Sequence, residues 1–136
     1  MTASLSPEIF WLVAVTLMTG MVWMPYIVNR IVEHGLWTAL KNPDTDTQPK
    51  AKWAQRAEAA HKNAVENLVV FGVLVLALVV TDTQTAMTAT AAVVFFYARA
   101  AHLVIYILGI PLIRTLAFFI GFLAQMVVGL TIVGGV

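Results

Sequence analysis

The sequence predicts an all-α integral membrane protein, built as an up-and-down bundle of four membrane-spanning helices. Hydrophobic residues fill 60% of its 136 positions and charged residues only 11%, and the mean hydropathy is +0.86. A soluble domain carries about 25% charged residues, so this chain lacks the polar cover that a water-exposed surface needs. The length fits a single domain over residues 1–136.

Composition also excludes several kinds of site. The formal net charge of +1 is too small for a nucleic-acid-binding surface, which would be strongly basic. The chain has no cysteine, which excludes a disulfide, a thiolate nucleophile and a cysteine-ligated metal. Its three histidines lack the paired spacing of a metal-binding helix, so no metal site is expected.

Four apolar segments, taken in order along the chain, account for the predicted bundle. The first span covers residues 9–28 and contains Pro25, which should kink it. The second covers residues 64–80, and it approaches the roughly 20 residues that a bilayer requires only if its polar start enters the membrane. The third covers residues 86–108 and the fourth 112–133. Short connections make the last three spans antiparallel neighbours.

The basic residues give these spans an orientation. The long connection over residues 29–63 carries most of them, the connection over residues 81–85 carries none, and Arg114 follows the third connection. The positive-inside rule therefore places the first and third connections in the cytoplasm and both termini on the other side of the membrane. Asn42-Pro43 makes part of the first connection an irregular loop.

Polar residues on the second helix mark the first half of a candidate site. At 100° per residue, Arg56, Asn63 and Asn67 share one side of this helix, and Glu66 lies about 80° away from them. An ionisable residue at membrane depth is costly, so it usually marks a site with a specific partner. This helix is therefore expected to bring polar groups to a pocket.

The third helix carries the second half of the candidate site. Arg99, His102 and Tyr106 form a stripe at spacings of three and four residues. Arg114 at the start of the fourth helix and Arg30 at the end of the first lie at the same predicted level, although both also fit ordinary positive-inside anchors. We expect a ring of polar and charged groups at one membrane face.

This set of groups suits a small zwitterionic peptide with more than one carboxylate. Arginines are fork-shaped donors for carboxylates, Glu66 can accept from an ammonium group, and Asn63 can serve a peptide group. Glutathione would satisfy every member, and a guanidinium near its thiol would favour the nucleophilic thiolate. The apolar helix faces beside the pocket can hold a lipophilic second substrate from the bilayer.

The run from Ala60 to Asn67, AHKNAVEN, resembles the helix-2 motif of the MAPEG family, the membrane-associated proteins in eicosanoid and glutathione metabolism. The likeness is greatest to members of the microsomal glutathione transferase 1 type. Ala98-Arg99, Tyr106 and the run 114–122 also resemble family motifs, in the same order and over nearly the whole chain. This resemblance implies a homotrimer with glutathione bound between adjacent subunits near the cytosolic face.

The resemblance also implies a role for each polar residue. The glutathione-binding residues would be Arg30, His61, Asn63, Glu66, Arg99 and Tyr106. Arg114 would stabilise the thiolate and is therefore the expected catalytic residue. Ala59 stands where family members commonly have an arginine, and Arg56, about one turn earlier, would compensate for it. Asn67 and His102 are further binding candidates.

Structural roles remain open for the same residues. Glu66 and Arg99 would also fit a buried ion pair that fixes helix packing. Asn63 and Asn67 would fit interhelical hydrogen bonds, which are common between membrane helices. His102 has no second ligand nearby in the sequence and fits a packing histidine.

Three functions follow from these alternatives. The leading one is a membrane enzyme that conjugates glutathione to hydrophobic electrophiles in detoxification, with lipid hydroperoxide reduction as a second activity. The next is a non-catalytic lipid- or partner-binding member of the same family. The presence of Arg114 favours the enzyme over this alternative. The third is a small transporter or channel subunit whose Glu66, Arg99 and His102 line an ion path. The expected partners are glutathione, a hydrophobic electrophile or lipid, membrane lipids and further copies of the chain.

Overall fold

The computed structural model describes residues 4–44 and 47–134, and these ranges contain helices and no strand. The helices follow in the order α1 (Pro7–Met21), α2 (Trp23–His34), α3 (Leu36–Leu40), α4 (Lys52–Val80), α5 (Ala86–Leu108) and α6 (Pro111–Gly134). Four helical stretches are long and apolar enough to cross a membrane: Pro7–His34, Lys52–Val80, Ala86–Leu108 and Pro111–Gly134. The predicted all-helical class, with four helices that are able to span a membrane, is confirmed for the described residues.

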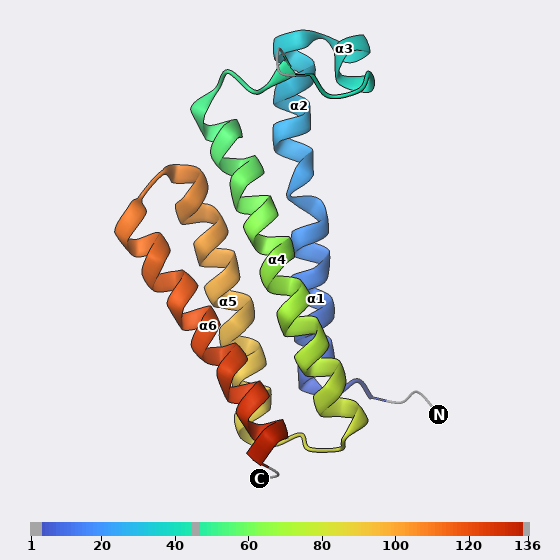
Figure 1. The fold of residues 1–136 in the computed structure, drawn as a ribbon, viewed down its shortest axis with the longest axis vertical. Helices are drawn as coiled ribbons and strands as arrows, with labels where there is room; N and C mark the ends of the chain where they lie inside the picture. Colours follow the sequence, from blue (N-terminus) through green and yellow to red (C-terminus); the bar gives the residue numbers. More distant parts are fainter. Residues whose placement is uncertain (1–3, 45–46, 135–136) are drawn as a thin grey trace.

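The long helices run side by side, with α4 and α5 in the middle (Figure 1). The rod of α1 and α2 packs along α4, α1 also packs against α5, and α5 and α6 form a hairpin. At one end of the bundle α1 begins, α6 finishes and α4 turns into α5. We call this the terminal end. The opposite end carries α3 and the α5–α6 turn, and we call it the loop end.

The first membrane helix is broken between α1 and α2. Ser6 caps its start by accepting a hydrogen bond from the backbone N–H of Ile9 at 3.3 Å. The helix is interrupted at Val22, three residues before Pro25. Proline has no N–H to donate to the carbonyl four residues earlier, and its ring crowds that carbonyl, which belongs to Met21. The regular helix is therefore interrupted one turn before Pro25, at Val22, whose backbone dihedrals stay helical, and the kink stays a prediction.

The second membrane helix is longer than the sequence pattern indicates. α4 begins at Lys52, well before residue 64, because much of the connection over residues 29–63 is helical. The Glu33 carboxylate at the end of α2 accepts from the backbone N–H groups of Lys50 (2.8 Å) and Ala51 (3.0 Å), which ties down the chain just before α4. Buried alanines then line the first turns of α4: Ala54, Ala57, Ala60 and Ala64. Small side chains at this spacing let neighbouring helices approach closely.

The α5–α6 hairpin has well-defined ends. Thr85 and Thr88 form a reciprocal capping box at the start of α5. Its last turn closes at Gly109, whose φ of +80° is a left-handed conformation that favours glycine. Pro111 follows as the first residue of α6, where its missing N–H and fixed φ are tolerated. The turn between the two helices is therefore short and conformationally restricted.

The apolar core lies in the middle and toward the terminal end. The rings of Phe71 on α4 and Phe95 on α5 are stacked with centroids 3.8 Å apart, and both are buried. Val75 and Leu78 continue this core along α4. At the terminal end the buried Glu8 accepts a 2.7 Å hydrogen bond from the hydroxyl of Thr88, which joins α1 to α5. The polar residues of the predicted site lie outside this core, toward the loop end.

Candidate functional site

Arg99 is a buried cation with an incomplete set of partners. Its side chain on α5 is only 3% exposed, and one terminal nitrogen, Nη2, donates to Oδ1 of Asn63 on α4 at 2.6 Å. The Nε and Nη1 atoms are buried and have no hydrogen-bond partner among the described residues. Unpaired buried donors are costly, and a guanidinium is a fork-shaped donor for carboxylates. The arrangement can therefore accept an anionic group.

A cavity of about 290 Å³ lies beside Arg99 at the loop end. We call it the Arg114 pocket, and its lining residues are Asn63, His102, Tyr106, Arg114, Thr115 and Phe118. Asn63 links it to Arg99, and the Arg99 guanidinium carbon lies 6.0 Å from the Phe118 ring. Two arginines therefore lie within or next to one small pocket.

Arg114 is held over an aromatic ring. Its guanidinium carbon lies 4.3 Å from the ring centroid of Tyr106, which is close enough for a cation–π contact. Tyr106 also meets the buried His102 edge to face, with centroids 5.5 Å apart. The Nδ1 atom of His102 is buried and has no hydrogen-bond partner in the described part of the chain. The residues that line the pocket therefore supply hydrogen-bond donors, and none of these residues is a carboxylate.

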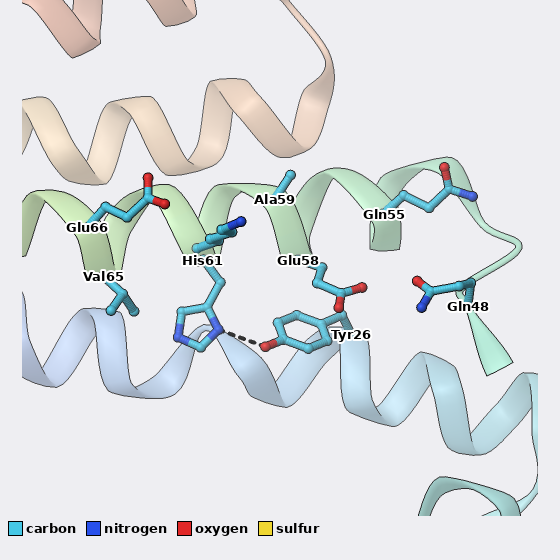
Figure 2. Close-up of a pocket in the computed structure, with 9 residues that line it drawn as sticks. Tyr26, Gln48, Gln55, Glu58, Ala59, His61, Val65 and Glu66 are labelled. Carbon is cyan, nitrogen blue, oxygen red and sulfur yellow. Dashed lines mark hydrogen bonds between the residues drawn. The ribbon is translucent and has the colours of Figure 1, made fainter. Parts of the chain in front are cut away.

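A second, larger cavity lies on the opposite side of α4, toward α2. We call this cavity of about 880 Å³ the Tyr26 pocket, and its lining residues are Tyr26, Gln48, Gln55, Glu58, Ala59, His61, Lys62, Val65 and Glu66. Figure 2 shows His61 reaching from α4 toward Tyr26 on α2, and their Nδ1 and hydroxyl atoms are 2.7 Å apart. Glu66 projects from α4 on the side away from α2.

The structure therefore divides the predicted site residues between two pockets. Asn63, Arg99, Tyr106 and Arg114 gather at the Arg114 pocket, together with His102. His61 and Glu66 line the Tyr26 pocket. Arg99 pairs with Asn63, and no ion pair joins it to Glu66 within the described residues.

Three further predicted residues make contacts within the chain. Arg30 donates through Nη2 to the Thr47 hydroxyl at 2.6 Å, so it holds the loop that precedes α4. The Nε atom of Arg56 donates to the carbonyl of Ile107 at 2.8 Å, at the end of α5. The Asn67 side chain donates to the carbonyl of Asn63 at 2.9 Å, within α4.

Two residues at or near the site were not anticipated from the sequence. Tyr26 follows Pro25 in an otherwise apolar segment, and only the packing of α2 against α4 brings it to His61. Gln125 is buried on α6 and donates to the backbone carbonyl of Asn67 at 3.0 Å. An amide in the middle of a membrane helix is a signal that could have identified Gln125, since such groups bond between helices.

The chemistry available here is the binding of an anion and the stabilisation of negative charge. A guanidinium, an imidazole, a phenol and an amide line one pocket, and a second guanidinium, that of Arg99, donates to this amide. In residues 4–44 and 47–134, no group of three or more His, Cys, Asp or Glu side chains is placed to hold a metal ion. The donor set instead fits a small molecule with carboxylates.

The comparisons with known proteins bear on the whole bundle. The model of the MAPEG family matches residues 9–134, which include the last three membrane-spanning helices, nearly all of the first and both pockets. No curated protein and no solved structure matches the chain.

Proposed function

This chain belongs to the MAPEG family, which includes glutathione transferases, and we propose that it conjugates glutathione to hydrophobic electrophiles in a membrane. The observation that carries the proposal is the guanidinium of Arg99, buried next to the Arg114 pocket with two nitrogens unpaired. A carboxylate of glutathione would supply the missing acceptor. Within the family, we expect the chain to be closest to the microsomal glutathione transferase 1 type.

The two pockets suggest that one ligand is held by two copies of the chain. Glutathione carries two carboxylates and one ammonium group. Asn63 and Arg99 would hold a carboxylate in the Arg114 pocket, and Glu66 is suited to the ammonium group. Because Glu66 and Arg99 are not paired in one chain, a neighbouring chain would bring its own Glu66 and His61 to the ligand.

A stripe on α4 supports a homotrimer. Its exposed residues are Lys62, Glu66, Val69, Val73, Leu76 and Val80, with alternating spacings of four and three. This is the heptad spacing by which helices pack around a common axis. Val69 and Val73 are 61% and 63% exposed in the single chain. Packing the α4 helices of three copies around a common axis would cover them.

Arg114 would perform the charge stabilisation at the sulfur. Its guanidinium at the edge of the pocket lowers the thiol pKa, and the released proton leaves to water. The thiolate then attacks an electrophilic carbon, a carbon–sulfur bond forms, and the leaving group departs with its electron pair. The reduction of lipid hydroperoxides would use the same thiolate.

The second substrate would reach the pocket from the lipid. Phe118 lines the Arg114 pocket and is 37% exposed, and Phe119 and Phe122 continue an exposed aromatic surface along α6. A hydrophobic electrophile can partition into the bilayer and approach the sulfur past these rings. Glutathione would enter from the loop end, which we propose to be cytoplasmic because it carries the basic residues.

Titration of the detergent-purified protein with glutathione tests this proposal. Isothermal titration should show binding, and thiolate absorbance in the ultraviolet should appear at neutral pH in the same mixture. Binding without a thiolate signal would favour a non-catalytic family member that presents lipids or binds partners. Absence of binding to the intact oligomer would reject the glutathione assignment.

A further inference from the structure

The end of α5 is held by a side chain from α4. The Nε atom of Arg56 donates to the backbone carbonyl of Ile107 at 2.8 Å. Ile107 is in the last turn of α5, where carbonyls lack partners within the helix and carry the negative end of its dipole. The residue four positions later is Pro111, which has no N–H to offer this carbonyl. The guanidinium therefore satisfies a group that the backbone cannot.

Gly109 provides the room for this contact. A Cβ atom at residue 109 would lie 3.2 Å from both Cζ and Nε of Arg56. The φ of +80° at the same residue also disfavours any side chain. The turn between α5 and α6 is thus shaped so that Arg56 can lie against its backbone.

The same turn carries the proposed thiolate-stabilising residue. The N–H of Gly109 donates to the carbonyl of Tyr106 at 3.0 Å, and the N–H of Arg114 donates to the carbonyl of Ile110 at 3.4 Å. The Arg114 guanidinium stacks on the Tyr106 ring, which lies on the other arm of the turn. A shift of the turn would therefore move Arg114 and Tyr106 relative to the rest of the pocket.

Arg56 and Asn63 share one face of α4. They are seven residues apart, which is about two helical turns or 10 Å. Asn63 binds Arg99, and Arg56 binds the end of α5. α4 consequently fixes the distance between the Arg99 side of the pocket and the turn that carries Arg114.

From these contacts we infer that Arg56 is a positioning residue that holds Arg114 in place by fixing the α5–α6 turn. The inference rests on the proposed function in assigning Arg114 to the sulfur. The contact itself is independent of that assignment. Arg56 in this role acts through the backbone of Ile107 and does not need to touch glutathione.

Two substitutions separate the contact from the charge. Arg56→Met keeps much of the side-chain length but removes the donor, and Arg56→Lys keeps a charged donor with a different reach. Lys52→Ala is the matched control, because Lys52 is an exposed cation on the first turn of the same helix. Each oligomeric variant is compared with the parent by hydrogen–deuterium exchange of peptides that cover residues 104–115.

Arg56→Met should speed amide exchange in the α5–α6 turn about tenfold, which corresponds to the loss of one charge-assisted hydrogen bond. Arg56→Lys should restore part of the protection, and Lys52→Ala should match the parent. In conjugation assays with an aryl halide, kcat should fall about tenfold in Arg56→Met while KM for glutathione changes by less than about twofold.

Each outcome decides the inference. Unchanged exchange in the turn of Arg56→Met would overturn it, whatever the activity. A rise in KM at constant kcat would instead make Arg56 a direct ligand contact. Should Arg56→Met fail to assemble, turn exchange in Arg56→Lys equal to the parent's together with a reduced kcat would also overturn it. If the parent binds no glutathione, the proposed function fails while the exchange data still test the contact.

Discussion

The hydroxyl of Tyr26 on α2 lies 2.7 Å from Nδ1 of His61 on α4, so one hydrogen bond joins the two helices inside the Tyr26 pocket. A phenol is a stronger acid than a neutral imidazole N–H, so Tyr26 is the expected donor. The imidazole proton then resides on Nε2, which makes His61 a donor toward the remaining space of the pocket. This tautomer suits a ligand carboxylate.

Tyr26→Phe should therefore weaken glutathione binding about two- to tenfold, since one hydrogen bond that orients His61 is lost. Isothermal titration measures the change, and nitrogen NMR of the labelled imidazole reports the tautomer. Tyr97→Phe is the control, because Tyr97 is 60% exposed on α5 and lies outside both pockets. A proton found on Nδ1 of His61 in the parent would contradict the proposed donor role.

Asn63→Asp should stabilise the protein and weaken glutathione binding together. The new carboxylate would give the partly unpaired Arg99 guanidinium a charged acceptor in place of the Asn63 amide oxygen, so the midpoint of thermal unfolding should rise by about 2–5 °C. Affinity for glutathione should fall about tenfold, because the aspartate competes with the ligand's carboxylate. Thermal unfolding and titration on the same preparation measure both effects.

Asn67→Asp is the matched control for that substitution. Asn67 lies one turn deeper on the same face of α4, and its side chain bonds within its own helix. A carboxylate there would be half-buried and would lose the amide donor that now faces the carbonyl and Oδ1 of Asn63, so stability should fall. Equal effects of the two aspartates would show that Arg99 is not short of an acceptor.

Arg114→Ala should remove the thiolate signal and lower conjugation of an aryl halide about 10²- to 10³-fold, the range found for single groups that stabilise transition-state charge. Binding should persist in part through Arg99 and Asn63. Arg114→Lys keeps the charge without the fork and should retain part of the activity. Conjugation by Arg114→Ala at the parental rate would reduce Arg114 to a topological anchor.

The α4 stripe predicts where trimer contacts lie. Val69→Ala combined with Val73→Ala should shift the oligomer toward monomer in native mass spectrometry, because packing drives association between helices in lipid. Val13→Ala combined with Val104→Ala is the control, since these valines are also exposed but lie on α1 and α5. An unchanged oligomer in the first double variant, or equal loss in both, would reject the stripe as the interface.

Helix periodicity predicted the fold and one half of the site. The spacing of Arg56, Asn63 and Asn67 placed them on one face of α4, and two of them do contact α5. The same periodicity placed Glu66 about 80° away. Glu66 accordingly lines the Tyr26 pocket and not the Arg114 pocket, although the charges of Glu66 and Arg99 suggested a pair within the chain.

The rest of the site depends on tertiary contacts that a periodic pattern does not contain. Tyr26 reaches His61 because α2 packs on α4. The sequence predicted Arg30 as a ligand residue, which stays a prediction, but it could not predict that the loop before α4 folds back and gives its Nη2 atom Thr47 as a partner. Side-chain partners across elements depend on how helices rotate about their axes, and sequence spacing leaves that rotation open.

The stacked rings of Phe71 and Phe95 separate the polar loop end of the chain from its terminal end. They lie one turn deeper than Asn67 and Arg99, and the apolar core continues from them toward the terminal end. In the described part of the chain, a polar solute that reaches Arg99 from the loop end therefore meets a buried apolar layer. A glutathione conjugate formed there would have to return to the compartment that supplied the thiol. Export across the membrane would then fall to a separate carrier.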